Sequence, residues 1–143
     1  MIVELTRFRA LPGTEAVIDE WMDFLASHPK EFKETLEPEK MYVESIFREQ
    51  RDGITYLYWY SVQGEDPKPV SESDHWFDKK HIEYWEKCID ETFVPEDLSV
   101  VLTAMPDRVE HVMRPLEDTH STCTTCTTCT TCTTYISALT CAC

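Results

Sequence analysis

His81 is the side chain with the clearest potential for chemistry in this sequence. It lies between Asp74 and Asp90, where apolar residues recur at helical spacing. A histidine on the buried stripe of a helix could act as an acid, a base or an axial ligand in a cavity against a sheet. The alternative is a ring packed in the core with one nitrogen hydrogen-bonded. For a lone histidine we favour that structural interpretation.

Glu44 and Arg48 form a second candidate pair, on one face of a predicted strand and about 13 Å apart at the rise of a strand. In a covered sheet they would be buried charges in need of partners, which would suit a polar ligand. The competing interpretation is an edge strand with solvated charges, a common protection of sheet edges, and it is the one we favour.

Aromatic side chains are dense on the predicted third strand and on the helix of His81. They could line a pocket for a planar ligand such as haem, flavin or a polyketide-like compound, although aromatics at strand and helix periods more often form core or interface. If a cavity lies between that helix and the sheet, the expected ligand-binding residues are Glu44, Arg48, Tyr58, Tyr60, His81 and Trp85. His81 is also the best catalytic candidate.

A metal site in this region is not expected. Asp74, His75, Asp78 and His81 have ligating side chains, but helical spacing makes only Asp78 and His81 neighbours. Two ligands do not complete a site, because closure needs three or four groups. We therefore predict neither a metal ion nor a cofactor.

The end of the sequence has a different composition, since residues 119 to 143 contain no charged side chain. Cys123, Cys126, Cys129 and Cys132 have the C-x-x-C spacing of iron–sulfur and zinc ligands, separated only by threonine. A perfect period of three without apolar residues is better explained by low complexity. We predict one folded domain over residues 1–115 and a disordered or artefactual tail over 116–143, with soft-metal binding by the thiols as the alternative.

Composition excludes several classes of partner. The formal net charge of −14 repels nucleic acid, and no cluster of lysine and arginine opposes it. Met1 to Leu5 resembles the start of a strand and lacks the basic and apolar regions of a signal peptide. No later apolar segment reaches the length of a membrane helix. The sequence therefore predicts a cytoplasmic protein without a membrane or nucleic-acid partner.

The hydrophobic pattern predicts a β-α-β-β-α-β order. A strand over 2–10, a helix from Thr14 to Pro29 and a short helical piece over 31–36 come first. Strands over 41–49 and 54–63 flank Asp52-Gly53, a strong hairpin signal that pairs Phe47 with Tyr58 if the loop has two residues. A helix from Ser71 or Ser73, a strand from Leu98 to Met105 and a final helix from Pro106 to Met113 follow. This order predicts an α+β, ferredoxin-like fold: a four-stranded antiparallel sheet with two helices on one face.

The predicted third strand is apolar on both faces, with tyrosines on one side and Leu57 and Trp59 on the other. Exposing either face would leave an apolar patch larger than a soluble monomer usually tolerates. We therefore predict a homodimer in which a second copy covers the open face of the sheet.

Four segments together resemble an uncharacterised bacterial family, domain of unknown function 6176: Leu5 to Arg9 with Pro12-Gly13, Glu39 to Glu49, Tyr56 to Gly64, and Asp78 to Asp90. The resemblance covers about residues 1 to 113. It implies the dimeric α/β-barrel superfamily, which includes antibiotic-synthesis monooxygenases and haem-degrading enzymes, but it implies no reaction, because such members share a fold and not a site.

Three functions remain open on this basis. The first is binding of a small ligand between the second long helix and the sheet. The second is an enzyme of the same fold, either a cofactor-independent or a haem-degrading monooxygenase with His81 as base or iron ligand. The third is a structural or interaction module without a pocket. We rank them in this order, because nucleophile motifs, phosphate loops and a full metal set are missing.

Overall fold

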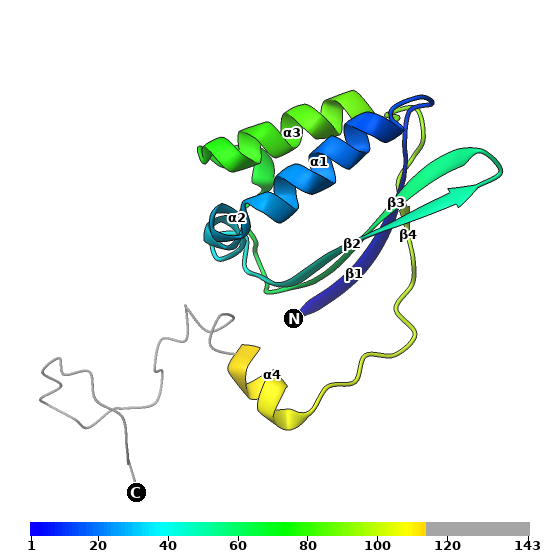
Figure 1. Cartoon of the computed structure of the whole chain (residues 1–143). Helices are drawn as coiled ribbons and strands as arrows, with labels where there is room; N and C mark the ends of the chain where they lie inside the picture. The colour runs from blue at the N-terminus through cyan, green and yellow to red at the C-terminus, as the bar shows by residue number, and fades with distance from the viewer. Residues whose placement is uncertain (114–143) are drawn as a thin grey trace, which may run out of the picture.

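The structure is a computed structural model that describes residues 1–113, and the predicted tail lies outside these residues. It is an α+β fold with a four-stranded antiparallel sheet (Figure 1). The elements in chain order are β1 (Ile2–Arg9), α1 (Glu15–Ser27), α2 (Pro29–Leu36), β2 (Met41–Arg51), β3 (Ile54–Gln63), the 3₁₀ helix η1 (Val70–Glu72), α3 (Trp76–Cys88), β4 (Glu96–Asp97) and α4 (Asp107–Met113).

The strands are arranged in the order β2-β3-β1-β4. The hairpin of β2 and β3 has the predicted register, with Phe47 opposite Tyr58 and Glu44 opposite Ser61. Asp52 and Gly53 both adopt positive φ, 53° and 77°, as a two-residue type I′ turn requires. The predicted pairing is therefore confirmed, and β2 lies at an edge of the sheet.

Helices α1 and α3 lie side by side over one face of the sheet (Figure 1). Their apolar stripes meet Leu57 of β3 in a core whose largest fully buried side chains are Trp21, Phe77, Ile18, Leu57 and Cys88. This core holds α3 against the sheet, and so it positions His81, which lies on the same helix.

Thr14 is the N-cap residue of α1, and His75 is the N-cap residue of α3. The Thr14 hydroxyl donates to the carbonyl of Leu11 at 2.7 Å and makes no cap bond to α1. At α3 the N-cap is His75, whose Nδ1 accepts a hydrogen bond from the backbone N–H of Phe77 at 3.3 Å. The helix predicted from Ser71 or Ser73 begins later, at Trp76, because the chain forms η1 before α3.

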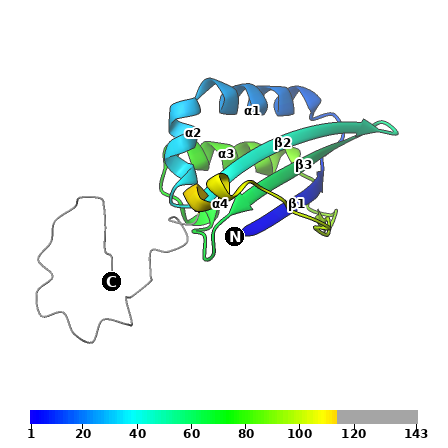
Figure 2. The same ribbon diagram turned by 90° about the horizontal axis from the view of Figure 1, so that it is seen from below.

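The predicted strand from Leu98 to Met105 is also wrong. Only Glu96 and Asp97 pair with β1, and after Leu98 the chain leaves the sheet. Val101 and Leu102 are 97% and 82% exposed. β-propensity expresses packing against neighbours, and within residues 1–113 no further strand pairs with this segment. Figures 1 and 2 place the segment and α4 on the side of the sheet opposite α1 and α3.

None of the helices found between residues 1 and 113 combines the length and apolar character needed to cross a membrane.

Candidate ligand-binding site

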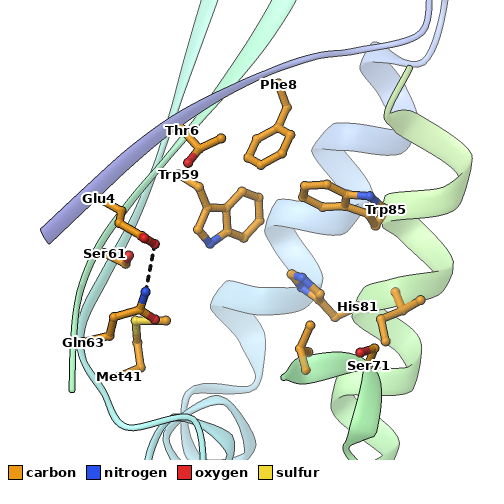
Figure 3. Close-up of a pocket in the computed structure, with 12 residues that line it drawn as sticks. Glu4, Thr6, Phe8, Met41, Trp59, Ser61, Gln63, Ser71, His81 and Trp85 are labelled. Carbon is orange, nitrogen blue, oxygen red and sulfur yellow. Dashed lines mark hydrogen bonds between the residues drawn. The ribbon is translucent and has the colours of Figure 1, made fainter. Parts of the chain in front are cut away.

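A cavity of about 370 Å³ lies between the sheet, α3 and η1 (Figure 3). Its walls are mainly apolar, with a smaller number of polar side chains, as is common for small-molecule sites. The lining residues are Glu4, Thr6 and Phe8 of β1, Met41 of β2, Trp59, Ser61 and Gln63 of β3, Val70 and Ser71 of η1, and His81, Ile82 and Trp85 of α3.

Two indoles form the aromatic part of this wall. Trp59 and Trp85 have ring centroids 5.8 Å apart, and Phe8 meets Trp85 edge to face at 4.6 Å. Behind them the buried Trp21 packs against both indoles. These contacts come from β1, β3, α1 and α3, so the aromatic wall is fixed by the core and is largely formed before any ligand arrives.

His81 lies beside Trp59, with ring centroids 5.6 Å apart. Trp21 donates its indole N–H to Nδ1 of His81 at 3.3 Å. Since an indole N–H can only donate, Nδ1 must be the acceptor, and a neutral ring then has its proton on Nε2. Burial lowers the pKa of His81 to about 4, partly opposed by the negative charge of Asp78. At neutral pH the ring is therefore uncharged and offers an N–H donor.

This state of His81 suits binding better than catalysis. A base with a pKa near 4 takes a proton poorly at neutral pH. Coordination of iron through Nε2 would require the ring proton to move to Nδ1, and the hydrogen bond from Trp21 would then be lost.

A polar edge lies at the β1 and β3 side of the cavity. The Gln63 amide donates to Oε2 of Glu4 at 2.8 Å, the bond drawn as a dashed line in Figure 3. The Thr6 hydroxyl donates to Oδ1 of Asp97 at 2.7 Å, which ties the cavity wall to β4. Ser61 and Ser71 add hydroxyls to the lining. An otherwise apolar ligand could thus be oriented by a few polar groups.

Glu44 lies behind the aromatic wall and not in it. It is partly buried on the helix-facing side of β2 and accepts a hydrogen bond from the indole N–H of Trp59. Burial raises the pKa of Glu44, Asp78 raises it further, and the bond from Trp59 opposes both effects. Glu44 therefore holds the Trp59 ring in place.

Arg48 is not at the cavity. Its guanidinium donates to Oδ1 of Asp19 on α1 at 2.7 Å, and both side chains reach solvent. β2 is an edge strand, and the ion pair of Arg48 is exposed to solvent. Both observations agree with the interpretation of Arg48 as a solvated charge at the edge of the sheet.

Tyr58 and Tyr60 project from the other face of β3, because side chains alternate along a strand. With Leu5 and Phe47 they line a separate hollow on the open face of the sheet. The expectation that they share a cavity with His81 is therefore wrong. Of the six predicted ligand-binding residues, only His81 and Trp85 line the cavity.

The prediction missed the contributions of β1 and η1. Phe8 and Thr6 reach the cavity because β1 lies next to β3, with Thr6 opposite Trp59. Alternation along β3 already separated Trp59 and Ser61 from the tyrosines, so these two could have been found from the sequence. Ser71 could not, because η1 follows a proline-containing linker without a periodic pattern.

Within residues 1–113, no group of three or more histidine, cysteine, aspartate and glutamate side chains is arranged to hold a metal ion.

Comparison with known proteins identifies a family whose function is unknown. The model of a family of unknown function, DUF6176, matches residues 1–111. No curated protein matches the chain.

Proposed function

The chain belongs to DUF6176, a family of unknown function, and we propose that it binds a small, largely apolar ligand in the cavity between α3 and the sheet. The observation that carries this proposal is a cavity of about 370 Å³ walled by Trp59 and Trp85, with the neutral His81 at its side. An apolar wall supplies affinity, and an N–H donor together with the Glu4–Gln63 pair supplies orientation.

The test begins with native mass spectrometry of the purified protein, to detect a small molecule that co-purifies, and with calorimetric titration of indole as an uncharged aromatic probe. Ser71→Phe would place a ring at an exposed lining position on η1 and is expected to weaken probe binding at least tenfold. Glu72→Phe is the matched control, because Glu72 is exposed on the same element but does not line the cavity.

Absence of both a co-purifying molecule and any indole binding would refute the proposal. Equal binding of indole to the native protein and to Ser71→Phe would place the site elsewhere.

The enzymatic alternatives receive less support from the site. Both a cofactor-independent and a haem-degrading monooxygenase would use His81 as a base or an iron ligand, and its Nδ1 is engaged by Trp21. Titration with haem tests this point: we expect no shift of the Soret band. A shift that disappears in His81→Ala would favour the haem enzyme instead.

We further propose that the fold is ferredoxin-like and of the dimeric α/β-barrel kind, with a second copy covering the open face of the sheet. The strand order β2-β3-β1-β4 supports this fold. Phe47, 56% exposed, and the hollow that it lines with Leu5, Tyr58 and Tyr60 support an interface. The exposed apolar segment after β4 lies beside the same face and would add to the buried area.

Size-exclusion chromatography and native mass spectrometry test the dimer. Phe47→Asp is expected to give monomers at micromolar concentration, because a charge would be buried in the interface. Ala26→Asp, on an exposed position of α1, is the matched control and is expected to remain dimeric. A native protein that is monomeric at these concentrations would contradict the proposal.

A further inference from the structure

The two nitrogens of the His81 ring have different surroundings. Nδ1 accepts the indole N–H of Trp21 at 3.3 Å, and Trp21 is fully buried and does not line the cavity. His81 itself lines the cavity, and its ring extends from α3 toward the sheet (Figure 3). Since Nδ1 is turned to Trp21, the ring edge with Nε2 is the part of the side chain that faces the cavity.

The bond from Trp21 also fixes the proton of the ring. An indole N–H cannot accept, so a proton on Nδ1 would place two donors against each other, and the ring proton therefore lies on Nε2. Within residues 1–113, no acceptor takes a hydrogen bond from Nε2. A partly buried N–H without an acceptor is costly, so a ligand that supplies one gains affinity.

Ser61 is a second polar group of the cavity without a partner. It is only 6% exposed and lines the cavity from β3. Among the lining residues, Figure 3 draws one hydrogen bond, from Gln63 to Glu4, and none to Ser61 or His81. Two largely buried polar groups, on the sheet and on α3, are therefore available to a ligand that enters between them.

The charges of the lining restrict the kind of acceptor. The lining contains no lysine or arginine, and Glu4 is its one residue with a charge at neutral pH. A carboxylate or phosphate would lose its hydration without gaining a positive partner, and Glu4 would repel it. A cation has no lone pair for the N–H of His81. The lining thus favours an uncharged acceptor.

We propose that the ligand of the cavity is an uncharged aromatic carbonyl compound, whose oxygen accepts the Nε2 proton of His81 while its rings lie against Trp59 and Trp85. The inference rests on the proposed function and names the class of its ligand. Because a carbonyl oxygen has two lone pairs, it can accept a second hydrogen bond, and the hydroxyl of Ser61 is a donor on the facing wall.

The test compares 1-indanone with indane, in which a methylene replaces the carbonyl, by calorimetric titration. His81→Asn removes the Nε2 donor and keeps, in Oδ1, an acceptor near the position of Nδ1 for the Trp21 N–H. The affinity of 1-indanone relative to indane should fall about fivefold in this variant. His75→Asn is the matched control and should leave the ratio unchanged, because His75 caps the same helix outside the lining and asparagine also caps helices.

Two further titrations locate the probes and test their charge. Ser71→Phe should weaken the binding of both 1-indanone and indane, since Ser71 lines the cavity. Indane-1-carboxylate, an anion with the same rings, should bind roughly tenfold more weakly than 1-indanone. Tighter binding of the anion would overturn the requirement for an uncharged ligand.

A measurement on the native protein guards against misfolding of His81→Asn, which circular dichroism would detect. In ¹⁵N NMR spectra, Nε2 of His81 should resonate as a protonated nitrogen and Nδ1 as an unprotonated one. The Nε2 signal should move more with 1-indanone than with indane. Equal changes with both probes, or a proton on Nδ1, would overturn the hydrogen bond to the carbonyl.

The outcomes separate the two proposals. If both probes bind and Ser71→Phe weakens them, but their affinity ratio is the same in the native protein and in His81→Asn, the carbonyl ligand is overturned and the cavity function stands. No binding of either probe would overturn both.

Discussion

Replacement of Glu39 by glutamine should make the protein more stable at alkaline pH. Glu39 is partly buried in the turn before β2, and its pKa in the folded protein is about 7 because of burial and the nearby charges of Asp78 and Glu44. In the unfolded chain the same carboxyl titrates near the ordinary value of 4.5. Glutamine keeps the size of the side chain and removes the charge, so Glu39→Gln isolates the cost of ionising this group.

The sign follows from proton binding in the two states. Between pH 4.5 and 7 the folded protein holds a proton on Glu39 that the unfolded chain has released. The stability that this neutral carboxyl contributes is complete below pH 4.5 and is lost as pH rises through 7. The full difference in pKa corresponds to about 3 kcal/mol, and because Glu39 is partly exposed we expect about 2 kcal/mol.

The assay is urea unfolding of the native protein and of Glu39→Gln at pH 5, 6, 7 and 8. The free energy of unfolding of Glu39→Gln minus that of the native protein should increase by about 2 kcal/mol from pH 5 to pH 8. His81, whose lowered pKa changes stability in the opposite direction between pH 4 and 6.5, is present in both proteins and cancels in the difference.

Glu37→Gln is the matched control, since Glu37 is exposed on the same turn. Its difference from the native protein should stay within about 0.5 kcal/mol over the range, as for most surface substitutions. A difference for Glu39→Gln that is constant with pH, or that decreases, would refute the electrostatic account of the three carboxylates.

Three further predictions concern the core and the hairpin. Trp21→Ala should lower the free energy of unfolding by about 3 to 5 kcal/mol in urea titrations, because the ring is fully buried. A loss below about 1 kcal/mol would contradict the packing of Trp21 in the hydrophobic core. Gly53→Ala should cost about 1 kcal/mol in thermal unfolding, since φ is +77° although nothing lies within 4 Å of the added carbon, and an increase in stability would speak against the type I′ turn. Cys88 should resist alkylation in the folded protein and react after unfolding, because burial raises the pKa of its thiol; peptide mapping after iodoacetamide would show this, and rapid modification of the folded state would disprove it.

Much of the fold was accessible from the sequence. Asp52-Gly53 between two alternating runs specified the hairpin and its register, because a two-residue turn and a two-faced pattern allow only one pairing. The apolar spacing around Trp21 and Phe77 likewise identified α1 and α3. The strand expected at Leu98 to Met105 was wrong, since an apolar alternating pattern does not reveal whether a partner strand exists in the same chain.

The candidate site was predicted less well than the fold. Trp85 and His81 could be assigned to the buried side of their helix, and both line the cavity. Tyr58 and Tyr60 were grouped with them, although the alternation of β3 sends them to the opposite face. The sequence also did not predict the ion pair between Arg48 and Asp19. That pair depends on how α1 packs relative to the edge strand β2.

The amino-acid sequence by itself determined the two long helices, how β2 pairs with β3, and that His81 lies on a buried helical stripe, because these features follow from local periodicity and turn chemistry. Only the tertiary structure decided the tautomer of His81, the aromatic wall of Trp59 and Trp85, and the burial of Glu39 near the charges of Asp78 and Glu44. These depend on contacts between side chains far apart in the sequence, and burial then sets their charge, which no local pattern encodes.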